Sequence, residues 1–329
     1  WIYLAYELMN ILITGAAGFI GYHLSKKLLI DKHKVFGLDN VNSYYDVKLK
    51  KNRIKSLKNF TDFHFFKIDI CKSNQIDKIL KKNNIKYIIH LAAQAGVRYS
   101  IENPDIYFKN NVDGFFKIME LAKENKVKHF IFASSSSVYG DKKEFPLSEL
   151  SNTDFPLSFY GATKKTNEIM AYSYSSIYKM PATALRFFTV YGPYGRPDMS
   201  LFKFTKNILA GKKIELFNSG NHVRDFSYVD DIVQGIASII KKPSKNKIPF
   251  NCFNIGNGSP RKLKDFLNEI EKNLGKKAKI NSKPLQKGDV VKTHSDISAI
   301  QKYSGYKPKT DIKIGIKKFI NWYKSYFVN

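Results

Sequence analysis

The chain is predicted to fold as an α/β protein with a doubly wound parallel sheet, followed by a smaller C-terminal α/β part. Three features of the sequence predict this: short apolar runs alternate with amphipathic stretches, a glycine-rich turn follows the first apolar run, and the alternation becomes irregular after about residue 187. Strands that alternate with helices form βαβ units with helices on both faces of the sheet. Their right-handed crossovers bring the carboxyl ends of the strands to one edge, where we expect the chemistry.

The elements of the first half follow in order. Leu8–Thr14 is predicted as a buried strand and Gly18–Ile30 as a helix. Apolar residues at helical spacing place one side of that helix inward, namely Phe19, Ile20, Leu24 and Leu28. Further strands, each preceded by a helical pattern, are expected at Lys34–Asp39, Phe63–Ile68, Tyr87–Ala92 and His129–Ser134.

The second half is predicted to hold the substrate. We assign residues 9–187 to the sheet domain and 188–329 mainly to a substrate-binding domain, which begins with a helix at Leu201–Ala210. Two later segments, Asp230–Ile240 and Phe253–Ile255, are expected to return part of 226–258 to the main sheet. Because Met9 has the look of a natural start, residues 1–8 are interpreted as an upstream extension.

Composition excludes several classes of protein. Hydrophobic residues make up 43% and charged residues 25% of the chain, as in globular proteins. No run approaches the roughly 20 apolar residues of a membrane helix, and Cys71 and Cys252 lack the spacing of a zinc site or a disulfide framework. We therefore expect a cytoplasmic protein with no metal and no membrane partner.

The net charge of +27 allows two interpretations, binding to nucleic acid or attraction of small anions. The lysines are spread over the whole chain, with no basic arm and no stripe interleaved with aromatic residues. We favour small anions and expect no nucleic-acid partner.

The glycine-rich turn reads Gly15-Ala-Ala-Gly18-Phe-Ile-Gly21, directly after the first strand. Such a turn lets a pyrophosphate approach the backbone at the positive end of a helix. The alternative is a tight turn without a ligand. Asp39 ends the second strand, 18 residues beyond Gly21, where a carboxylate binds ribose hydroxyls and repels a 2′-phosphate. The pattern predicts NAD rather than NADP.

Tyr160 and Lys164 lie four residues apart, on one face of a predicted helix. A free phenol has a pKa of about 10, and a neighbouring ammonium favours the phenolate. The run Ser134-Ser-Ser-Ser137 ends a strand shortly before, so its hydroxyls can bond a substrate oxygen. A surface pair and a serine-rich turn are the alternative interpretations of the two motifs.

With these three motifs in this order, the chain resembles the extended short-chain dehydrogenase/reductase family from about Asn10 to Tyr323. The resemblance implies a Rossmann-type fold, with Tyr160 as general base or acid, Lys164 as its partner and a ribose ligand, and Ser135 as an auxiliary hydroxyl. It also implies a homodimer through the helices that hold Asn111 and Tyr160. The further NAD contacts that it implies are Phe19, Ile20, Asn40, Asp69, Ile70, Leu91, Ala92, Ala93, Asn111 and Phe187. His90 is interpreted as a strand-end residue near the cofactor.

Sugar-nucleotide members of this family hold a nucleoside diphosphate. Val223–Asp231 is similar to their diphosphate-binding stretch, with Arg224 as the phosphate contact and Phe217 beside the base. The loop from Gln286 to Asp289 is similar to their late pyrophosphate and ribose loop. Lys287 stands where this group usually has proline.

The reaction is predicted from the residues beside Ser135. Dehydratases of the family carry an acidic pair there and decarboxylases a glutamate, whereas this chain has Ser136 and Ser137. Epimerisation at C4 through a 4-keto sugar, with NAD regenerated in each cycle, fits better.

The segments Gln94–Ser100 and Arg186–Met199 closely resemble those of UDP-glucuronate 4-epimerases, which implies UDP-glucuronate as substrate and a place in the synthesis of acidic polysaccharide. Arg98, Thr189 and Arg196 are expected to contact the sugar. The last two would clamp its carboxylate and suppress decarboxylation; the alternative for Arg196 is a bond to a carbonyl or to Asp198. Other functions left open are 4-epimerisation of a neutral or N-acetylated UDP-hexose, UDP-glucuronate decarboxylation, and NAD binding or RNA binding without catalysis.

Overall fold

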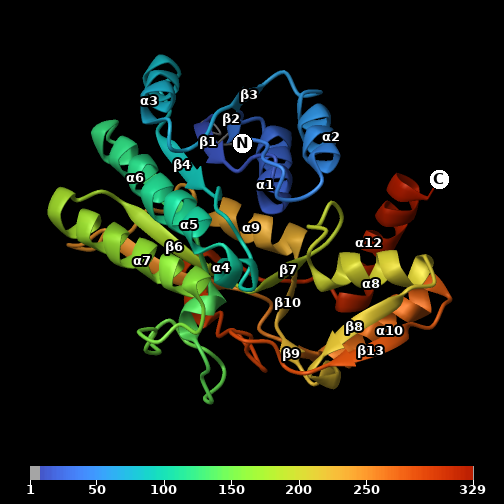
Figure 1. Ribbon diagram of the computed structural model, residues 1–329. Helices are drawn as coiled ribbons and strands as arrows, with labels where there is room; N and C mark the ends of the chain where they lie inside the picture. The colour runs from blue at the N-terminus through green and yellow to red at the C-terminus, as the bar shows by residue number, and fades with distance from the viewer. Residues whose placement is uncertain (1–7, 329) are drawn as a thin grey trace, which may run out of the picture.

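The centre of the computed structural model, which describes residues 8–328, is a seven-stranded parallel sheet (Figure 1). The strands stand in the order β11-β6-β5-β4-β1-β2-β3, so the order reverses between β1 and β4. Such a reversal opens a crevice at the carboxyl ends of the strands. The strands are β1 (Asn10–Thr14), β2 (Lys34–Asp39), β3 (Phe63–Lys67), β4 (Tyr87–His90), β5 (His129–Ser135), β6 (Ala182–Phe187) and β11 (Phe250–Ile255).

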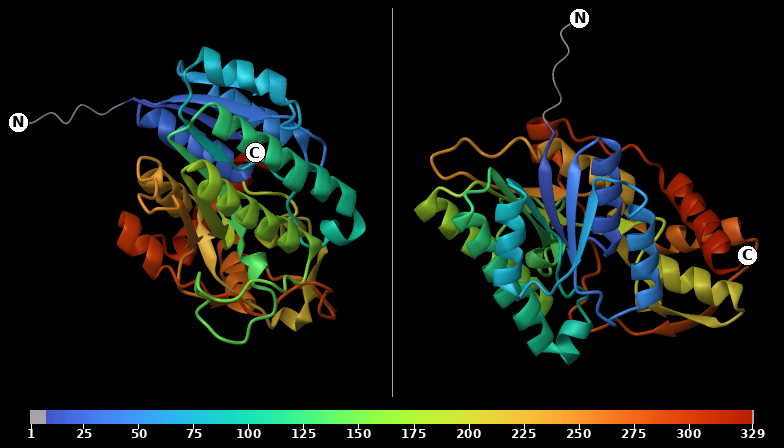
Figure 2. Two further views of the ribbon diagram at one scale, coloured as in Figure 1. Left: turned by 90° about the vertical axis from the view of Figure 1, so that its left-hand side faces the viewer. Right: turned by 90° about the horizontal axis from the view of Figure 1, so that it is seen from above.

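Helices cover both faces of this sheet, so the predicted doubly wound, Rossmann-type fold is confirmed (Figures 1 and 2). Alternate strand residues serve the two faces: Ile11 and Ile13 belong to one core, and Leu12 to the other. The first face carries α1 (Phe19–Ile30), α2 (Val47–Leu57), α9 (Val229–Ile239) and α11 (Ser298–Ser304). The second face carries α3 (Ser73–Lys82), α6 (Gly114–Glu124) and α7 (Phe159–Tyr178).

Short helical turns follow β4, β5 and β8 (Lys213–Phe217). They are α4 (Tyr99–Glu102), α5 (Pro104–Tyr107), the π-helical turn η1 (Phe108–Asp113) and the 3₁₀ turns η2 (Ser136–Tyr139) and η3 (Asn218–Gly220).

The smaller part pairs its short strands two by two and packs them on three helices. The pairs are β7 (Thr189–Tyr191) with β10 (Phe226–Tyr228), β8 (Lys213–Phe217) with β13 (Lys279–Lys283), and β9 (Val223–Arg224) with β12 (Arg261–Lys262). The helices are α8 (Ser200–Leu209), α10 (Leu263–Leu274) and α12 (Ile312–Phe327). One hydrophobic core runs from β1 and α1 into these helices, so the two parts bury apolar surface together.

Several predicted boundaries move by a few residues. The first strand begins at Asn10, because Leu8 is 62% exposed and pairs with no strand. The fourth strand ends at His90 rather than Ala92. The Ala92 amide donates to the Thr14 hydroxyl (3.2 Å) and not to a carbonyl of the neighbouring strand.

The segment 226–258 supplies the edge strand β11 beside β6 and the helix α9 beside α1. The division at residue 187 stays a prediction. Apart from Leu8, the extension expected at residues 1–8 lies outside the described residues. Among the helices of residues 8–328, none combines the length and the hydropathy that a membrane crossing requires.

Candidate active site

A continuous cavity of about 1300 Å³ lies at the carboxyl ends of the strands. It extends from the glycine-rich turn past Tyr160 and Lys164 to Arg224 in the smaller part. Other predicted site residues that line it are Gly15, Gly18, Phe19, Ile20, Gly21, Asp39, Asn40, Ile70, Leu91, Ala92, Ala93, Arg98, Ser135, Ser136, Ser137, Phe187, Thr189, Arg196, Phe217 and Asp289. Asp69, Asn111 and Gln286 do not line it.

The glycine-rich turn has no room for side chains. Gly15 has a φ of +73°, and a Cβ there would stand 2.8 Å from the Ala92 nitrogen. A Cβ at Gly21 would run into the Gly15 carbonyl oxygen. Since Gly18 precedes the first residue of α1, the free amides of that helix end open onto the cavity. The turn therefore fits a pyrophosphate.

Asp39 ends β2 beside this turn and is 9% exposed. Its carboxylate accepts hydrogen bonds from the Ala17 amide (3.1 Å) and the Val41 amide (2.8 Å). Burial raises the pKa of Asp39, and these two bonds and the nearby Lys50 work against that rise. Asp39 lines the cavity beside the turn, and its contact with a ribose stays a prediction.

Three of the predicted contact residues lie outside the cavity lining and bond other groups of the chain. Asp69 is engaged instead by the Asn40 amide (2.9 Å) and the Cys71 backbone (2.9 Å), and so orders the loop that follows β3. Asn111 is 1% exposed and lies in the π-helical turn. Its side-chain oxygen accepts from the Gln94 amide, and its side-chain nitrogen donates to the Gln94 carbonyl and to the Thr163 hydroxyl of α7.

The carbonyl of Gln286 accepts from the Asp289 amide (3.2 Å) and closes a turn that presents Asp289. The contacts of these three residues with NAD or with the substrate stay predictions.

Tyr160 and Lys164 occupy the first turns of α7, which Ser158 caps by accepting from the Gly161 amide (3.0 Å). The Lys164 ammonium donates to the Ala133 carbonyl (2.9 Å) and lies 5.9 Å from the centre of the Tyr160 ring. Ser135 ends β5, and its hydroxyl contacts the Ser137 hydroxyl (3.1 Å). The structure thus gathers the three predicted catalytic side chains at one place in the cavity.

Burial dominates the electrostatics of this group. It lowers the pKa of Lys164 to about 8. It raises the pKa of Tyr160, against the smaller lowering effects of the Ser135 hydroxyl and of Arg196. The depressed tyrosine pKa that the sequence predicts is therefore not reached in the chain alone. Desolvation of the phenolate outweighs these smaller effects, while the Lys164 ammonium donates to the Ala133 carbonyl.

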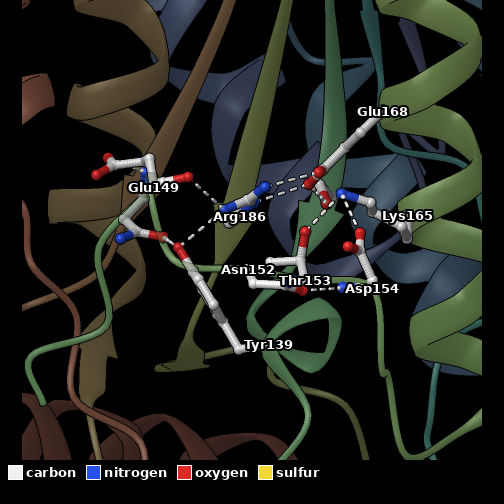
Figure 3. Close-up of polar contacts among 10 residues, drawn as sticks. Tyr139, Glu149, Asn152, Thr153, Asp154, Lys165, Glu168 and Arg186 are labelled. Atoms are coloured by element: carbon white, nitrogen blue, oxygen red, sulfur yellow. Dashed lines mark hydrogen bonds and ion pairs between the residues drawn. The ribbon is translucent and has the colours of Figure 1, made fainter. Parts of the chain in front are cut away.

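A buried polar network includes Glu168, Arg186 and Tyr139 (Figure 3). Glu168, two turns after Tyr160 on α7, forms a bidentate ion pair with Arg186 of β6 (2.9 and 2.8 Å) and accepts from the Ser134 hydroxyl (2.5 Å). Arg186 also donates to the Tyr139 hydroxyl (3.0 Å). Because Ser134 precedes Ser135, this network fixes the helix, the strand end and the turn η2 relative to one another.

Arg196 lies in the loop after β7 and already has a carboxylate partner. It donates to Asp198 through Nε (3.0 Å) and Nη2 (2.5 Å), and Nη2 also faces the Ala95 carbonyl (3.4 Å). These contacts, with a carbonyl and with Asp198, are the ones that the sequence predicts as the alternative to a carboxylate clamp. Since Arg196 and Thr189 both line the cavity, contact with a sugar carboxylate requires Arg196 to share its donors with Asp198.

The far end of the cavity is cationic and aromatic. Arg224 donates to the Asp289 carboxylate (2.9 Å) and to the Val291 carbonyl (2.9 Å). Arg98 lies over the Phe217 ring, 4.5 Å from its centre. Charge for a phosphate and an apolar face for a base therefore meet here.

Two further side chains at the site, Arg53 and His222, were not predicted from the sequence. The buried Arg53 of α2 donates to the Ala17 carbonyl of the glycine-rich turn (2.7 Å) and to the Tyr194 carbonyl of the Arg196 loop (2.6 Å). His222 lies buried beside Arg224. Neither belongs to a recognisable local pattern, because their partners lie far away in the chain.

The family described as "NAD dependent epimerase/dehydratase family" matches residues 11–256. The chain belongs to this family. The cofactor of the family is NAD, and the glycine-rich turn and Asp39 fit a dinucleotide. Within residues 8–328, no three His, Cys, Asp or Glu side chains are grouped as a metal site would need.

The chain is similar to known proteins over almost its whole length. "Protein CapI" of Staphylococcus aureus is 47% identical over 335 residues, which cover 97% of this chain and 99% of that protein. "UDP-glucuronate 4-epimerase 4" of Arabidopsis thaliana is 44% identical over 333 residues, covering 97% of this chain and 76% of the relative. The crystal structure of UDP-glucuronic acid 4-epimerase from Bacillus cereus, in complex with UDP-glucuronic acid and NAD, has a TM-score of 0.91 at 34% identity and covers 97% and 100% of the two chains.

Proposed function

We propose that this chain interconverts UDP-glucuronate and UDP-galacturonate by NAD-dependent epimerisation at C4. The observation that carries the proposal is one cavity that joins a dinucleotide turn, the Ser135–Tyr160–Lys164 group and a cationic end for a nucleoside diphosphate. The similarity to UDP-glucuronate 4-epimerases of known sequence and structure supports the choice of sugar.

The roles of the catalytic residues follow from their positions. NAD bound at the turn takes up a hydride from C4 and returns it to the other face of the 4-keto sugar. Tyr160 removes the proton of the C4 hydroxyl and later gives it back, and Ser135 bonds the same oxygen. The Lys164 ammonium favours the phenolate and, by analogy with the family, binds the ribose.

The side chains beside Ser135 support epimerisation over related reactions. Ser136 and Ser137 line the cavity and carry no acid or base for removing water or assisting decarboxylation. Thr189 and Arg196, which both line the cavity, would hold the sugar carboxylate and so keep its C–C bond out of line with the 4-keto group. Epimerisation of a neutral or N-acetylated UDP-hexose is the rival, since a UDP-N-acetylglucosamine 4-epimerase from Methanobrevibacter ruminantium has a TM-score of 0.86 at 29% identity.

The assembly belongs to the same proposal. Helices α6 and α7 lie side by side on one outer face of the molecule (Figure 2). Along α7 this face exposes Ile169 (58%), Tyr172 (49%) and Ile177 (65%). We propose that it forms a homodimer. Both cysteines are free thiols, in keeping with a cytoplasmic enzyme that acts in the synthesis of acidic polysaccharide.

The decisive experiment is incubation of the purified chain with UDP-glucuronate and no added NAD, followed by separation of the sugar nucleotides. We expect UDP-galacturonate to form, with no pentose product. Tyr160→Phe should retain bound NAD and abolish turnover, because only the phenolic oxygen is removed. Turnover by that variant contradicts its proton-transfer role, and activity on neutral UDP-hexoses alone would overturn the choice of sugar.

A further inference from the structure

His222 lies at the nucleotide end of the cavity, and neither of its ring nitrogens makes a hydrogen bond within the chain. The residue is 3% exposed, lines the cavity and precedes the two residues of β9. Its backbone is held by the Leu263 amide, which donates to its carbonyl (2.8 Å). Neither ring nitrogen has a hydrogen-bond partner. Buried polar atoms without a partner are uncommon and destabilising, which points to a missing ligand.

Other buried histidines of the chain provide the comparison. The His129 ring contacts the Ile240 carbonyl (3.0 Å) and the Thr183 hydroxyl (2.8 Å), and the His90 ring contacts the Thr14 hydroxyl (2.8 Å). Neither of these two lines the cavity. The histidines that serve packing are thus bonded within the chain, whereas the ring of His222 borders the cavity and is not.

Charged groups from several elements face this ring. Arg224 on β9 and Arg98 before α4 disfavour a second positive charge, while Asp289 favours it from 3.6 Å (Nε2 to Oδ2). Lys262 and Lys264 lie at the start of α10, whose Leu263 amide bonds His222. Burial, followed by Arg224, lowers the pKa of His222. In the chain alone the imidazole is therefore neutral near pH 7.

We propose that His222 is a further ligand of the nucleotide diphosphate and binds it as the imidazolium, so that nucleotide binding takes up a proton. The proposal rests on the proposed function only in that a nucleoside diphosphate enters here. A diphosphate held by Arg224 brings negative charge to this end of the cavity. That charge favours the protonated imidazole and so raises the pKa of His222. Proton uptake follows, because a group whose pKa rises on binding gains a proton at intermediate pH.

The test is calorimetric titration of the NAD-containing protein with UDP at pH 7.5, in two buffers of different ionisation enthalpy. The terminal phosphate of UDP, with a pKa of about 6, is mostly ionised at this pH, and a cationic site would make it release protons. A net uptake of protons must therefore come from a group of the protein and not from UDP. We expect uptake by the wild type, and a UDP affinity that falls as the pH rises from 6.5 to 8.5.

His222→Gln should abolish the proton uptake and weaken UDP binding by about tenfold or more, the loss typical of one charge-assisted contact. Uridine should bind both proteins equally. His294→Gln is the matched control, because His294 faces the Gly258 carbonyl (3.3 Å) and does not line the cavity. This control should bind UDP with the proton uptake of the wild type.

Wild-type binding without proton uptake would overturn the proposal, as would an equal loss of uridine and UDP affinity in His222→Gln. If that variant fails to fold, the wild-type titration still decides. UDP contains no sugar, so these outcomes do not depend on which UDP-sugar is epimerised.

Discussion

At the scale of single residues, Arg196 is the side chain whose surroundings most affect the choice of substrate. Its guanidinium is shared between Asp198 and the Ala95 carbonyl in the chain alone. A sugar carboxylate can join this arrangement, because a guanidinium carries five donors and Arg196 uses two of its nitrogens for Asp198.

Arg196→Ala should lower kcat/KM for UDP-glucuronate by about 10- to 100-fold, the range for a lost hydrogen bond to a charged group. A decarboxylated pentose should appear among the products, since the carboxylate is no longer fixed. Product separation by chromatography measures both effects. Asp198→Asn, which retains the guanidinium, should form no pentose. An unchanged kcat/KM for Arg196→Ala would contradict the proposal that Arg196 holds the sugar carboxylate.

Lys164 is 2% exposed and has no carboxylate partner among its contacts, so its charge costs stability. The pKa falls from 10.5 to about 8, and at 1.36 kcal/mol per unit this is on the order of 3 kcal/mol. The unfolded chain keeps the lysine proton up to about pH 10. The penalty is therefore complete below about pH 8 and disappears as the pH rises past the unfolded pKa.

Lys164→Met should therefore stabilise NAD-free protein at pH 7 by about 1–3 kcal/mol, after subtracting the lost bond to the Ala133 carbonyl. The difference should shrink towards pH 10, while epimerisation is lost at every pH. Denaturant titrations of both proteins at the two pH values provide the measurement. A stability difference that does not change with pH would argue against a buried ammonium.

At the scale of elements, the ion pair of Glu168 and Arg186 joins α7 to β6 (Figure 3). Glu168 also accepts from Ser134 and so reaches the end of β5. Side-chain exposures of 7% and 5% mean that neither charge is solvated. Removing one partner of such a pair leaves a buried charge uncompensated, whereas removing both does not.

Arg186→Met should reduce the free energy of unfolding by about 3–5 kcal/mol. It should also lower kcat, because the strand end that carries Ser135 loses its support. The double variant Glu168→Gln with Arg186→Met should be more stable than Arg186→Met alone. Equilibrium unfolding of the two single variants and the double variant forms the required cycle. Purely additive losses would show that the pair does not act as a unit.

At the scale of the whole molecule, α7 exposes apolar side chains that include Ile169 and Ile177. Ala171 and Ser175 of the same helix are fully buried, so the helix has an inner and an outer face. An outer face of this character is typical of subunit contacts.

Ile169→Asp should convert the proposed dimer to monomers, because a carboxylate would be desolvated at the contact. Sedimentation velocity at micromolar protein concentration measures the change. Ile314→Asp on α12 is the matched control, since Ile314 is similarly exposed (54%) on a helix outside this face and should leave the assembly unchanged. A wild-type protein that sediments as a monomer would contradict the proposed interface.

Much of the fold could be predicted because its signals are local. Strand and helix periodicity placed β1, α1 and β2 within two residues of their observed bounds, and the glycine-rich turn required nothing beyond seven consecutive residues. Tyr160 and Lys164 share one helix face, so their proximity also followed from spacing alone.

The contacts that complete the site are decided by tertiary structure. Arg53 reaches Tyr194, 141 residues away, and His222 faces Asp289, 67 residues away. Asn111 matches a family motif, but its bonds to the Gln94 backbone and to Thr163 follow only from the packing of distant segments. The physical reason is that periodicity records how each segment divides its surface between core and solvent. Which buried charge meets which partner, and so which pKa shifts, depends on the packing of segments that are distant in the chain.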